Sequence, residues 1–428
     1  MKDKLIQYRR EFHKYAENSW DEIRTSARVA EILSQIGVDQ ILTGEEVVDA
    51  SILKFPTDLP EERRKANMKR AIAQGANPEL VKATGGYPGV IGIFNTGRPG
   101  PTYALRFDMD CLPYTEYHEA GFRPVDEGYV SINPDSVHAC GHDAHTAIGL
   151  GLAQEIKDHI DDYCGVIKLI FQPAEEGNLG AKSIVAKGHL DDVDLFLSVH
   201  LALSAENTPL PSNTIACGCR DFLSNRRLYV TFHGRAAHPC GASQEGKNAL
   251  LAACSAALNL HAIAPHEKGL GRINVGEIEG GLCTNTICPE CTIRLEYRGQ
   301  TPEIAQYFGR RVFDVLDGTS KTYDMPYTVV DFDEVPTAQS DPELMAVIQE
   351  KAETIPWFKK IFFDGNLGGT DDAAAMMAKV QENGGKATYI GIGCDITEPL
   401  HNPKFDFDED CMEPTVQLLA KTMREYLG

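Results

Sequence analysis

The densest group of metal-binding side chains in this sequence is the segment VHACGHDAHTA at residues 137–147. Thiolate, imidazole and carboxylate groups are ligands that Zn²⁺ and related ions prefer. Cys140 and His142 are two positions apart, and in an extended segment this spacing would place both on one side of the chain. On these residues alone, a metal site and a metal-free loop rich in Cys and His are equally good interpretations.

Two adjacent carboxylates, Glu175 and Glu176, follow the apolar run GVIKLIFQ at residues 165–172. The run predicts a strand buried on both faces, and open α/β sheets place their sites at such strand ends. Neighbouring carboxylates repel each other unless a cation or a proton lies between them. One glutamate could bind a metal while the other accepts a proton from water. A solvated acidic turn is the alternative, and Pro173 and Gly177 weigh against it because they fix a tight turn.

Further candidate side chains also stand where predicted strands end. His200 closes LFLSVH, His401 lies in EPLHN, and Asp108 and Asp110 are the acidic residues of ALRFDMD. Taken singly, each histidine is better explained as a core residue with satisfied hydrogen bonds. The two aspartates could both reach one rim of the sheet, or they could simply belong to a turn.

The elements that must position these residues alternate between strand and helix. Helices are expected from just after His145 to about Asp161 and near residues 179–188, and apolar runs predict strands at Val90–Asn95, Thr102–Asp108, Gly165–Gln172 and Leu195–His200. This alternation predicts an α/β domain with a mostly parallel central sheet. Residues at about 56–84 are charged and helix-prone, so they predict a helical insertion between two short strands.

The pattern changes between residues 224 and 333, where the predicted order is β-α-β-β-α-β, with the second helix at Pro302–Leu316. This order is the ferredoxin-like arrangement of an α+β domain. We therefore predict a discontinuous domain of residues 1–223 and 334–428 that carries the chemistry, and an inserted domain of residues 224–333.

Composition limits the partners that this chain can have. A net charge of −21 over 428 residues disfavours binding to nucleic acid and to anionic membranes. The apolar stretches are far shorter than the roughly 20 residues of a membrane-spanning helix. The first 20 residues are charged and lack the apolar core of a signal peptide, so we expect a cytoplasmic protein with its twelve cysteines reduced.

Taken together, the motifs resemble the M20 metallopeptidase family in its amidohydrolase branch, which includes aminoacylases, auxin-conjugate hydrolases and carboxypeptidase-like enzymes. They run in order from about residue 104 to 409: ALRFDMDCLP, HACGHDAHTA, FQPAEEG, GRAAHP, GGLCTN followed by Arg298, and HNPKFDFDE. The resemblance implies a zinc-peptidase-like α/β catalytic domain and an inserted ferredoxin-like domain that serves as a lid and in dimerisation. It also implies two divalent metal ions, with manganese, zinc and cobalt as the candidates.

The resemblance also implies a role for each candidate residue. Glu175 would be the general base, and Asp110 would orient a metal ligand, with Asp108 as a less certain partner. Cys140 would bridge the two ions. The other metal ligands would be His142, Glu176, His200 and His401.

In the inserted domain, His238 of GRAAHP would donate hydrogen bonds to the developing oxyanion, in the site of a partner subunit. Asn285 and Arg298 resemble substrate-holding positions, and arginine pairs bidentately with carboxylates. A turn histidine and an exposed arginine at a strand end are the alternatives. Cys288 departs from the Asn-Val-Ile-Pro-like sequence of many relatives, which weakens the assignment of Asn285.

Other departures concern residues near the predicted site. Asp371 stands where the family often has a glutamate, and this shorter side chain would alter a contact behind the metal ligands or the substrate pocket. The remaining cysteine pairs, C-x-C at residues 217–219 and C-x-x-C at residues 288–291, are interpreted as structural thiols, because they fall on opposite sides of the domain boundary.

These residue types fit hydrolysis of an amide bond beside a free carboxylate, with N-acyl or aryl-acyl amino acids as the substrates. p-Aminobenzoyl-glutamate is the leading candidate, because the helical insertion, ALLAACSAALNLHAIAPH and FDFDE resemble one subgroup of the branch. An aminoacylase or dipeptidase with another substrate, or a non-catalytic subunit of a hydrolase complex, is the alternative. Either a homodimer or a heterodimer with a related chain is expected.

Overall fold

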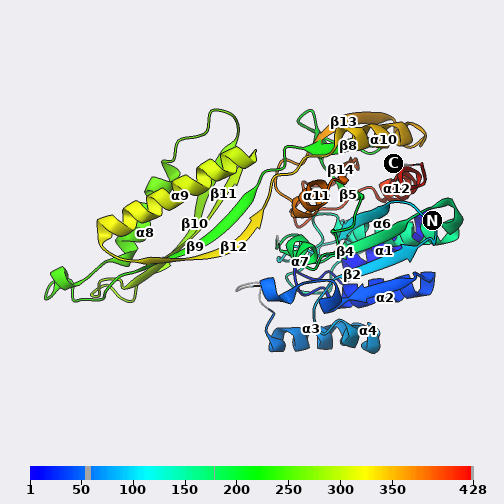
Figure 1. The fold of residues 1–428 in the computed structure, drawn as a ribbon. Helices are drawn as coiled ribbons and strands as arrows, with labels where there is room; N and C mark the ends of the chain where they lie inside the picture. Colours follow the sequence, from blue (N-terminus) through cyan, green and yellow to red (C-terminus); the bar gives the residue numbers. More distant parts are fainter. Residues whose placement is uncertain (54–58, 178, 426–428) are drawn as a thin grey trace. The chain divides into compact units, whose positions relative to one another are not determined.

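The computed structural model of the chain describes residues 1–53, 59–177 and 179–425. The chain divides into two compact units (Figure 1). Unit 1 comprises Met1–Asp221 with Ala338–Gly428, and unit 2 comprises Phe222–Thr337. Sequence analysis places the corresponding boundaries at residues 224 and 333.

Unit 1 is built on one ten-stranded mixed sheet. Its strand order is β1-β2-β4-β3-β5-β14-β8-β13-β6-β7. The strands are β1 (Gln40–Thr43), β2 (Val90–Asn95), β3 (Thr102–Asp108), β4 (Val166–Gln172), β5 (Leu195–Leu201), β6 (Ser204–Ala205), β7 (Thr208–Pro209), β8 (Thr214–Arg220), β13 (Lys360–Asn366) and β14 (Lys386–Ile392).

The parallel order holds within β4-β3-β5-β14 and again between β8 and β13, and the other pairs are antiparallel. The residues of β5 are all buried, and in β3 and β4 all but the first are buried. Such continuous apolar strands are typical of a sheet covered on both faces. Because parallel strands end at the same edge, this run places four carboxyl ends side by side.

Unit 1 also contains α-helices, some on the sheet and others on neighbouring helices. They are α1 (Lys2–Lys14), α2 (Ile23–Ile36), α3 (Glu61–Ala73), α4 (Pro78–Ala83), α5 (Arg123–Asp126), α6 (His142–Asp158), α7 (Gly180–Ala186), α10 (Pro342–Glu353), α11 (Ala373–Glu382) and α12 (Met412–Glu425). Short 3₁₀ turns lie at Gly44–Glu46, Ala50–Ile52, Ile160–Asp162, Ser243–Glu245 and Glu409–Cys411. No helix in the described ranges is both long and apolar enough to span a membrane.

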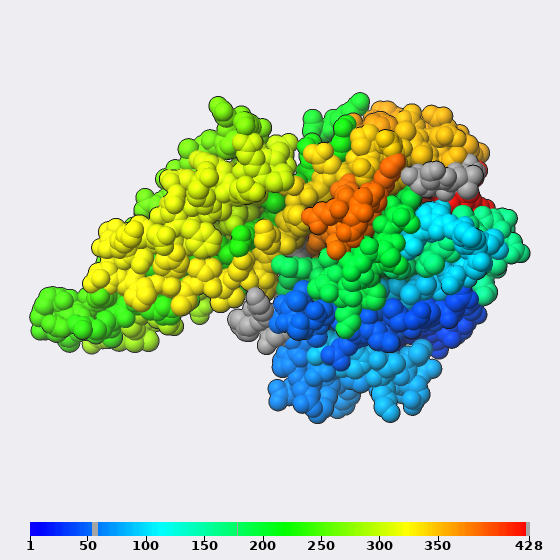
Figure 2. All heavy atoms as spheres, in the orientation of Figure 1, coloured from blue at the N-terminus to red at the C-terminus, as the bar shows by residue number. Residues whose placement is uncertain are grey.

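The predicted helical insertion is present as α3 and α4, which lie between β1 and β2 in sequence. Both helices pack against α2 and form the outer surface there, seen as the paler blue layer in Figures 1 and 2. Residues 56–58 of that prediction lie outside the described residues.

Helix α6 begins within the candidate metal segment, at His142, and it packs directly on the sheet. It contacts β3, β4 and β5 of the sheet and the helices α1, α2 and α12. Gly149 makes the close approach possible, because a Cβ there would lie 2.6 Å from Phe107 and 2.7 Å from Phe171. A larger side chain would therefore push α6 away from the strands that carry the candidate site.

Unit 2 has the predicted β-α-β-β-α-β order and its own apolar core. Its four strands form an antiparallel sheet in the order β10-β11-β9-β12. The elements are β9 (Asn225–His233), α8 (Ala249–His261), β10 (Gly271–Gly280), β11 (Glu290–Gly299), α9 (Pro302–Tyr323) and β12 (Tyr327–Val335). The predicted fold class, an α/β unit with an inserted ferredoxin-like unit, is confirmed.

One predicted boundary in unit 2 is wrong. Helix α9 continues to Tyr323 rather than ending at Leu316. Its buried residues keep helical spacing as far as Thr319, and Asp324 ends it in the left-handed conformation (φ 49°). Gly318 does not break the helix because it lies on the exposed face, where tertiary packing outweighs its low propensity.

Candidate metal centre

Four neighbouring strand ends supply the candidate side chains of unit 1. Asp108 ends β3, and the turn after β4 carries Glu175 and Glu176. His200 lies near the end of β5, and the loop after β14 carries His401. The parallel order of these strands thus gathers residues that are far apart in the sequence.

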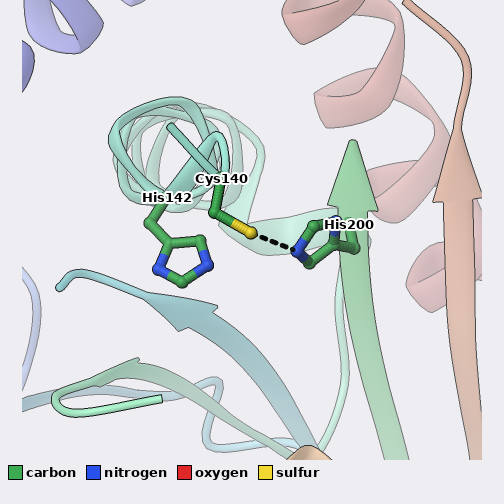
Figure 3. Close-up of side chains that lie close together, drawn as sticks. All are labelled: Cys140, His142 and His200. Carbon is green, nitrogen blue, oxygen red and sulfur yellow. Dashed lines mark hydrogen bonds between the residues drawn. The ribbon is translucent and has the colours of Figure 1, made fainter. Parts of the chain in front are cut away.

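Cys140 and His142 are held by a sharp turn and not by an extended segment, so the prediction of an extended backbone is wrong here. His142 is the first residue of α6, and Gly141 before it is left-handed (φ 85°). The turn still directs both side chains to one place (Figure 3). The Cys140 Sγ lies 3.6 Å from Nε2 of His200, which reaches the same place from β5.

The backbone of the His401 loop is tied to the Cys140 segment. The N–H of His401 donates to the carbonyl of Ala139 at 2.8 Å, and the hydroxyl of Tyr114 donates to the carbonyl of His401. His401 itself is left-handed (φ 66°), which for a residue other than glycine is a strained conformation that its surroundings must hold. These contacts bring the loop of His401 to the segment that carries Cys140.

Six candidate residues converge into three overlapping groups, in each of which the possible ligand atoms lie within 4.8 Å of one another. Cys140 belongs to two of the groups and His142 to two. The groups are Cys140 with His142 and His200, Cys140 with Glu176 and His401, and His142 with Glu175 and Glu176. Overlapping groups that share a thiol provide the arrangement needed to bind two neighbouring ions.

The hydrogen bonds around the histidines suit metal binding. Nδ1 of His142 donates to Asp110, at 3.0 Å to the backbone oxygen, and Nδ1 of His200 donates to the carbonyl of Leu201 at 2.7 Å. Each Nε2 then carries a lone pair that faces the other candidate ligands. Nε2 of His142 and Oε1 of Glu176 are buried and have no hydrogen-bond partner among the described residues. Buried polar atoms normally have one, so this donor set fits a bound divalent cation.

Asp110 organises the turn of the two glutamates. Its Oδ1 accepts the N–H of Glu175 at 3.1 Å, and its Oδ2 accepts the N–H of Glu176 at 3.0 Å. The hydroxyl of Ser19 donates to the same carboxylate at 2.6 Å. Ala174, the residue before Glu175, is left-handed (φ 52°), so the turn depends on these contacts.

Asp108 lies beside His142 and His145, with which it forms a further group of possible ligands. Its Oδ1 accepts from Nδ1 of His145 at 2.6 Å, while Nε2 of His145 accepts the N–H of Leu201 at 3.0 Å. Its Oδ2 forms an ion pair with Arg106 at 2.7 Å. Both nitrogens of His145 and Oδ1 of Asp108 are therefore engaged, while Oδ2 of Asp108 has the ion pair with Arg106 and no hydrogen-bond partner among the described residues.

Arg106 also neutralises the aspartates behind Glu175. It forms ion pairs with Asp371 at 3.1 Å and with Asp372 at 3.4 Å, and the hydroxyl of Tyr389 donates to Asp371. Asp371, whose role the sequence leaves open, thus belongs to a buried network around a guanidinium. The carboxylate of Glu175 lies beside that network.

Burial sets the charge of the free site. Burial, followed by the negative charge of Asp371, raises the pKa of Glu175 well above its usual value. Burial raises the pKa of Glu176 to about 7 and raises that of the Cys140 thiol, whereas it lowers the pKa of His200. Burial also opposes ionisation of Asp108, but Arg106, His142 and His145 together outweigh it and keep that pKa well below the usual range. Divalent cations would favour the thiolate and carboxylate forms of the ligands.

Comparison with known proteins agrees with this geometry. A model of the Peptidase family M20/M25/M40 matches residues 104–425. The chain belongs to this family. It is therefore a hydrolase of the metallo-amidohydrolase class, as the sequence predicts.

The chain is similar to named members of the M20 family over nearly its whole length. It is 41% identical to the indole-3-acetyl-aspartic acid hydrolase of Enterobacter agglomerans, with 98% of this chain and 94% of that protein covered. It is 39% identical to one of the subunits of the p-aminobenzoyl-glutamate hydrolase of Escherichia coli strain K12, with 98% and 95% covered. The solved structure of an aminobenzoyl-glutamate utilization protein from Klebsiella pneumoniae matches with a TM-score of 0.81 and 35% identity, covering 99% of this chain and 96% of that one.

The remaining predicted site residues of this M20 member lie in unit 2. His238 is exposed in the loop after β9, and its Nδ1 accepts the N–H groups of Cys240 and Gly241 at 3.2 and 3.0 Å. Its Nε2 must then carry the proton, which makes it a donor. Asn285 is exposed in the loop before β11. Arg298 on β11 forms an ion pair with Glu296 at 3.0 Å.

The other cysteine pairs lie in different units. Cys217 and Cys219 are buried on β8 of unit 1, and Cys288 and Cys291 are buried in unit 2. None of these four belongs to a potential metal-binding group within the described part of the chain.

Sequence reasoning missed Arg106, His145 and the N-terminal residues that brace α6. Arg9 and His13 are fully buried and both contact Asp143, at 2.7 and 2.8 Å. A signal for Arg106 was present, since a charged residue in the apolar run ALRFD needs a buried partner. No local pattern indicated the N-terminal contacts, because their partners lie more than 100 positions away.

Proposed function

We propose that this chain is a metal-dependent amidohydrolase that cleaves the amide bond of N-acyl or aryl-acyl amino acids with a free carboxylate. The observation that carries the proposal is the convergence of three residue groups, two of which contain Cys140 and two of which contain His142, with Glu175 next to Glu176 in one of them. A non-catalytic subunit would have no chemical need for a second, proton-holding carboxyl group beside a ligand.

The proposed site holds two divalent ions, which are manganese, zinc or cobalt. Cys140, as a thiolate, would hold these ions together with His142, Glu176, His200 and His401. Bound ions of this kind lower the pKa of a water molecule from about 16 to about 7 and polarise a carbonyl group. Asp110 keeps His142 and the glutamate turn in position through its hydrogen bonds.

Glu175 is the proposed general base. It accepts a proton from the attacking water and passes it to the amide nitrogen as the C–N bond breaks. Burial and the nearby Asp371 raise the pKa of Glu175, so the carboxyl group holds that proton well. This favours its role as a proton carrier between the two steps.

Unit 2 supplies the proposed contacts to substrate. Nε2 of His238 donates a hydrogen bond to the oxyanion, in the site of a partner subunit. Arg298 pairs with the free carboxylate of the substrate, and Asn285 holds its polar groups. In this proposal unit 2 acts as a lid and in dimerisation, with an identical or a related chain as the partner, in the cytoplasm.

The relatives favour a particular substrate class. One is named for indole-3-acetyl-aspartic acid and another for p-aminobenzoyl-glutamate, and both compounds join an aromatic acid to an acidic amino acid. We therefore place p-aminobenzoyl-glutamate first and other N-acyl amino acids and small dipeptides second. The acidic chain, with a net charge of −21, needs the metal ions and Arg298 to attract such anions.

A hydrolysis screen tests the proposal. Purified protein is assayed with p-aminobenzoyl-glutamate, indole-3-acetyl-aspartate and simple N-acyl amino acids, with Mn²⁺ and Zn²⁺ added separately and with a chelator as control. Metal-dependent release of the free aromatic acid is expected. If no compound is cleaved with either metal, by the chain alone or with a related partner chain, the proposal is wrong.

A further inference from the structure

Three successive N–H groups in the turn that carries the two glutamates donate to buried carboxyl groups. Those of Glu175 and Glu176 donate to Asp110, and that of Ala174 donates to Oε1 of Glu22 at 2.7 Å. Ala174 is the strained member of the turn, because its φ of 52° is left-handed and it is not a glycine. The shortest of the three contacts is thus made to the residue whose backbone most needs to be held. Glu22 is not among the residues to which the proposed chemistry assigns a role.

The carboxyl group of Glu22 is buried at a cost in free energy. The residue is 0% exposed, and its second oxygen, Oε2, has no hydrogen-bond partner among the described residues. Burying a carboxyl group that is not fully hydrogen-bonded is unfavourable. Burial, followed by the negative charge of Asp110, raises the pKa of Glu22 well above its usual value, so the neutral form is favoured. Glu22 therefore serves as a hydrogen-bond acceptor rather than as a negative charge.

Two helices hold Glu22 in place. Glu22 directly precedes α2, and its carbonyl oxygen accepts the N–H of Ser26 at 2.9 Å and the hydroxyl of Ser26 at 2.7 Å. On its other side, Arg63 of α3 forms an ion pair with Asp21 at 2.8 Å, and Arg70 of α3 donates to the carbonyl of Asp21 at 2.7 Å. The carboxyl group thus approaches the glutamate turn from a segment that both α2 and α3 anchor.

The conformation of Ala174 sets the direction of the residues that follow it. Glu175 and Glu176 come next in the chain, and they share a group of possible ligands with His142. Rotation of Ala174 into the right-handed or the extended region would turn both side chains away from these positions. Misplacing a reacting group by about 1 Å can cost about a hundredfold in rate. An acceptor for the Ala174 N–H is therefore a means of placing the proposed base and a ligand together.

We propose that Glu22 is a positioning residue of the metal centre, which holds Ala174 in the left-handed conformation so that Glu175 and Glu176 reach their places. Its effect on turnover rests on the proposed function, whereas its effect on the turn does not depend on any substrate. Two other roles, a charge beside Asp110 and a filler of core space, predict different results for variants of Glu22.

Kinetics of Glu22→Gln and Glu22→Asp at saturating metal separate these roles. Glutamine keeps the length of the side chain and an oxygen that accepts the Ala174 N–H, so kcat should stay within about twofold of the wild type. Aspartate is shorter by one methylene group and loses this contact. Its kcat should fall at least about tenfold with little change in KM, because Glu22 has no proposed contact with substrate. Glu62→Asp is the matched control, since Glu62 is exposed on α3, and it should behave as the wild type.

The other two roles give results that would overturn the proposal. A charge role predicts the opposite order, with Glu22→Asp active and Glu22→Gln impaired. A filler of core space predicts a lower unfolding temperature for Glu22→Asp with the kcat of the folded protein unchanged. Thermal unfolding of each variant is therefore recorded beside its kinetics.

Crystal structures of the two variants give a second measurement that needs no turnover. Ala174 should stay left-handed in Glu22→Gln and leave that region in Glu22→Asp. If the wild type cleaves none of the screened compounds, the proposed function is wrong and these structures still test the contact. A left-handed Ala174 in both variants would overturn the positioning role of Glu22 alone.

Discussion

Glu175 and Glu176 are neighbours in the chain, yet their carboxylates have different surroundings. Oε1 of Glu176 lies 3.5 Å from Nε2 of His401 and shares a group with Cys140. Glu175 shares one group with His142 and Glu176 and a second with the two carboxylates of Asp371 and Asp372. Neutral or cationic partners favour the ionised form of a carboxyl group, which can bind a metal, whereas nearby carboxylates favour the protonated form. The two roles thus follow from the environment of each side chain.

Replacing Glu175 by Gln removes the proton carrier while keeping the size of the side chain. We expect kcat to fall by roughly 10²- to 10⁴-fold, with the metal content unchanged. Steady-state kinetics and elemental analysis of the same preparation measure both quantities. Glu382→Gln, an exposed residue at the end of α11, is the control and should behave as the wild type. Wild-type turnover by the Glu175 variant would show that Glu175 is not the general base.

At the residue scale, the sequence was informative where chemical type and strand position coincided. Glu176 and His401 follow predicted strands and Cys140 lies in the densest group of metal-binding side chains, and the structure gathers all three. The network of Arg106 was not found, because its partners Asp371 and Asp372 are about 265 positions away. Long-range pairing of buried charges leaves no local pattern in a sequence.

At the scale of elements, the position of α6 decides the geometry of the centre. The helix begins at His142 and lies on β3 and β4, which end at Asp108 and just before the glutamate turn. Gly149 sets the distance between the helix and these strands. A shift of α6 would therefore move one ligand relative to the others.

Gly149→Ala should destabilise the protein and reduce its activity, because the new methyl group meets two aromatic rings in the core. Overpacking of this kind costs about 1–3 kcal/mol. Gly318→Ala is a matched control, since its Cβ would meet no atom within 4 Å on an exposed face of α9. That change should be neutral or stabilise by up to about 1 kcal/mol. Denaturant unfolding and kcat measure the effects, and equal stability of the two variants would contradict this view of α6.

The elements themselves were largely predictable, while their ends were less so. Apolar runs located β3, β4 and β5 because strands buried on both faces need continuous hydrophobic sequence. The turn at Gly141 was missed, since a two-residue spacing fits an extended segment as well as a helix start. The end of α9 was misplaced because tertiary packing carries the helix past Gly318.

At the scale of the whole molecule, the proposed reaction needs residues from both units. The candidate ligands belong to unit 1, whereas His238, Asn285 and Arg298 belong to unit 2. Sequence motifs can assign residues to units but cannot say which copy of a unit serves which metal centre. The proposal that His238 acts in the site of a partner subunit is therefore a statement about assembly, and it can be tested as one.

Two inactive variants should restore activity when they are combined. Glu175→Gln lacks the base and His238→Ala lacks the oxyanion donor, so each alone should be nearly inactive. If His238 acts across a dimer, half of the sites in a mixed dimer are intact, and coexpression should give about a quarter of wild-type activity. Kinetics of the mixed and separate preparations provide the comparison. Activity no greater than the sum of the two variants would place His238 in its own chain's site or outside catalysis.

The central claim is that Cys140 joins two ligand groups around a pair of divalent ions. Anomalous X-ray diffraction from crystals of the manganese-loaded protein measures this directly. The account predicts two manganese peaks, both within bonding distance of the Cys140 sulfur, with His200 at one and His401 at the other. No peak in this region, or a single peak that Cys140 does not contact, would contradict it.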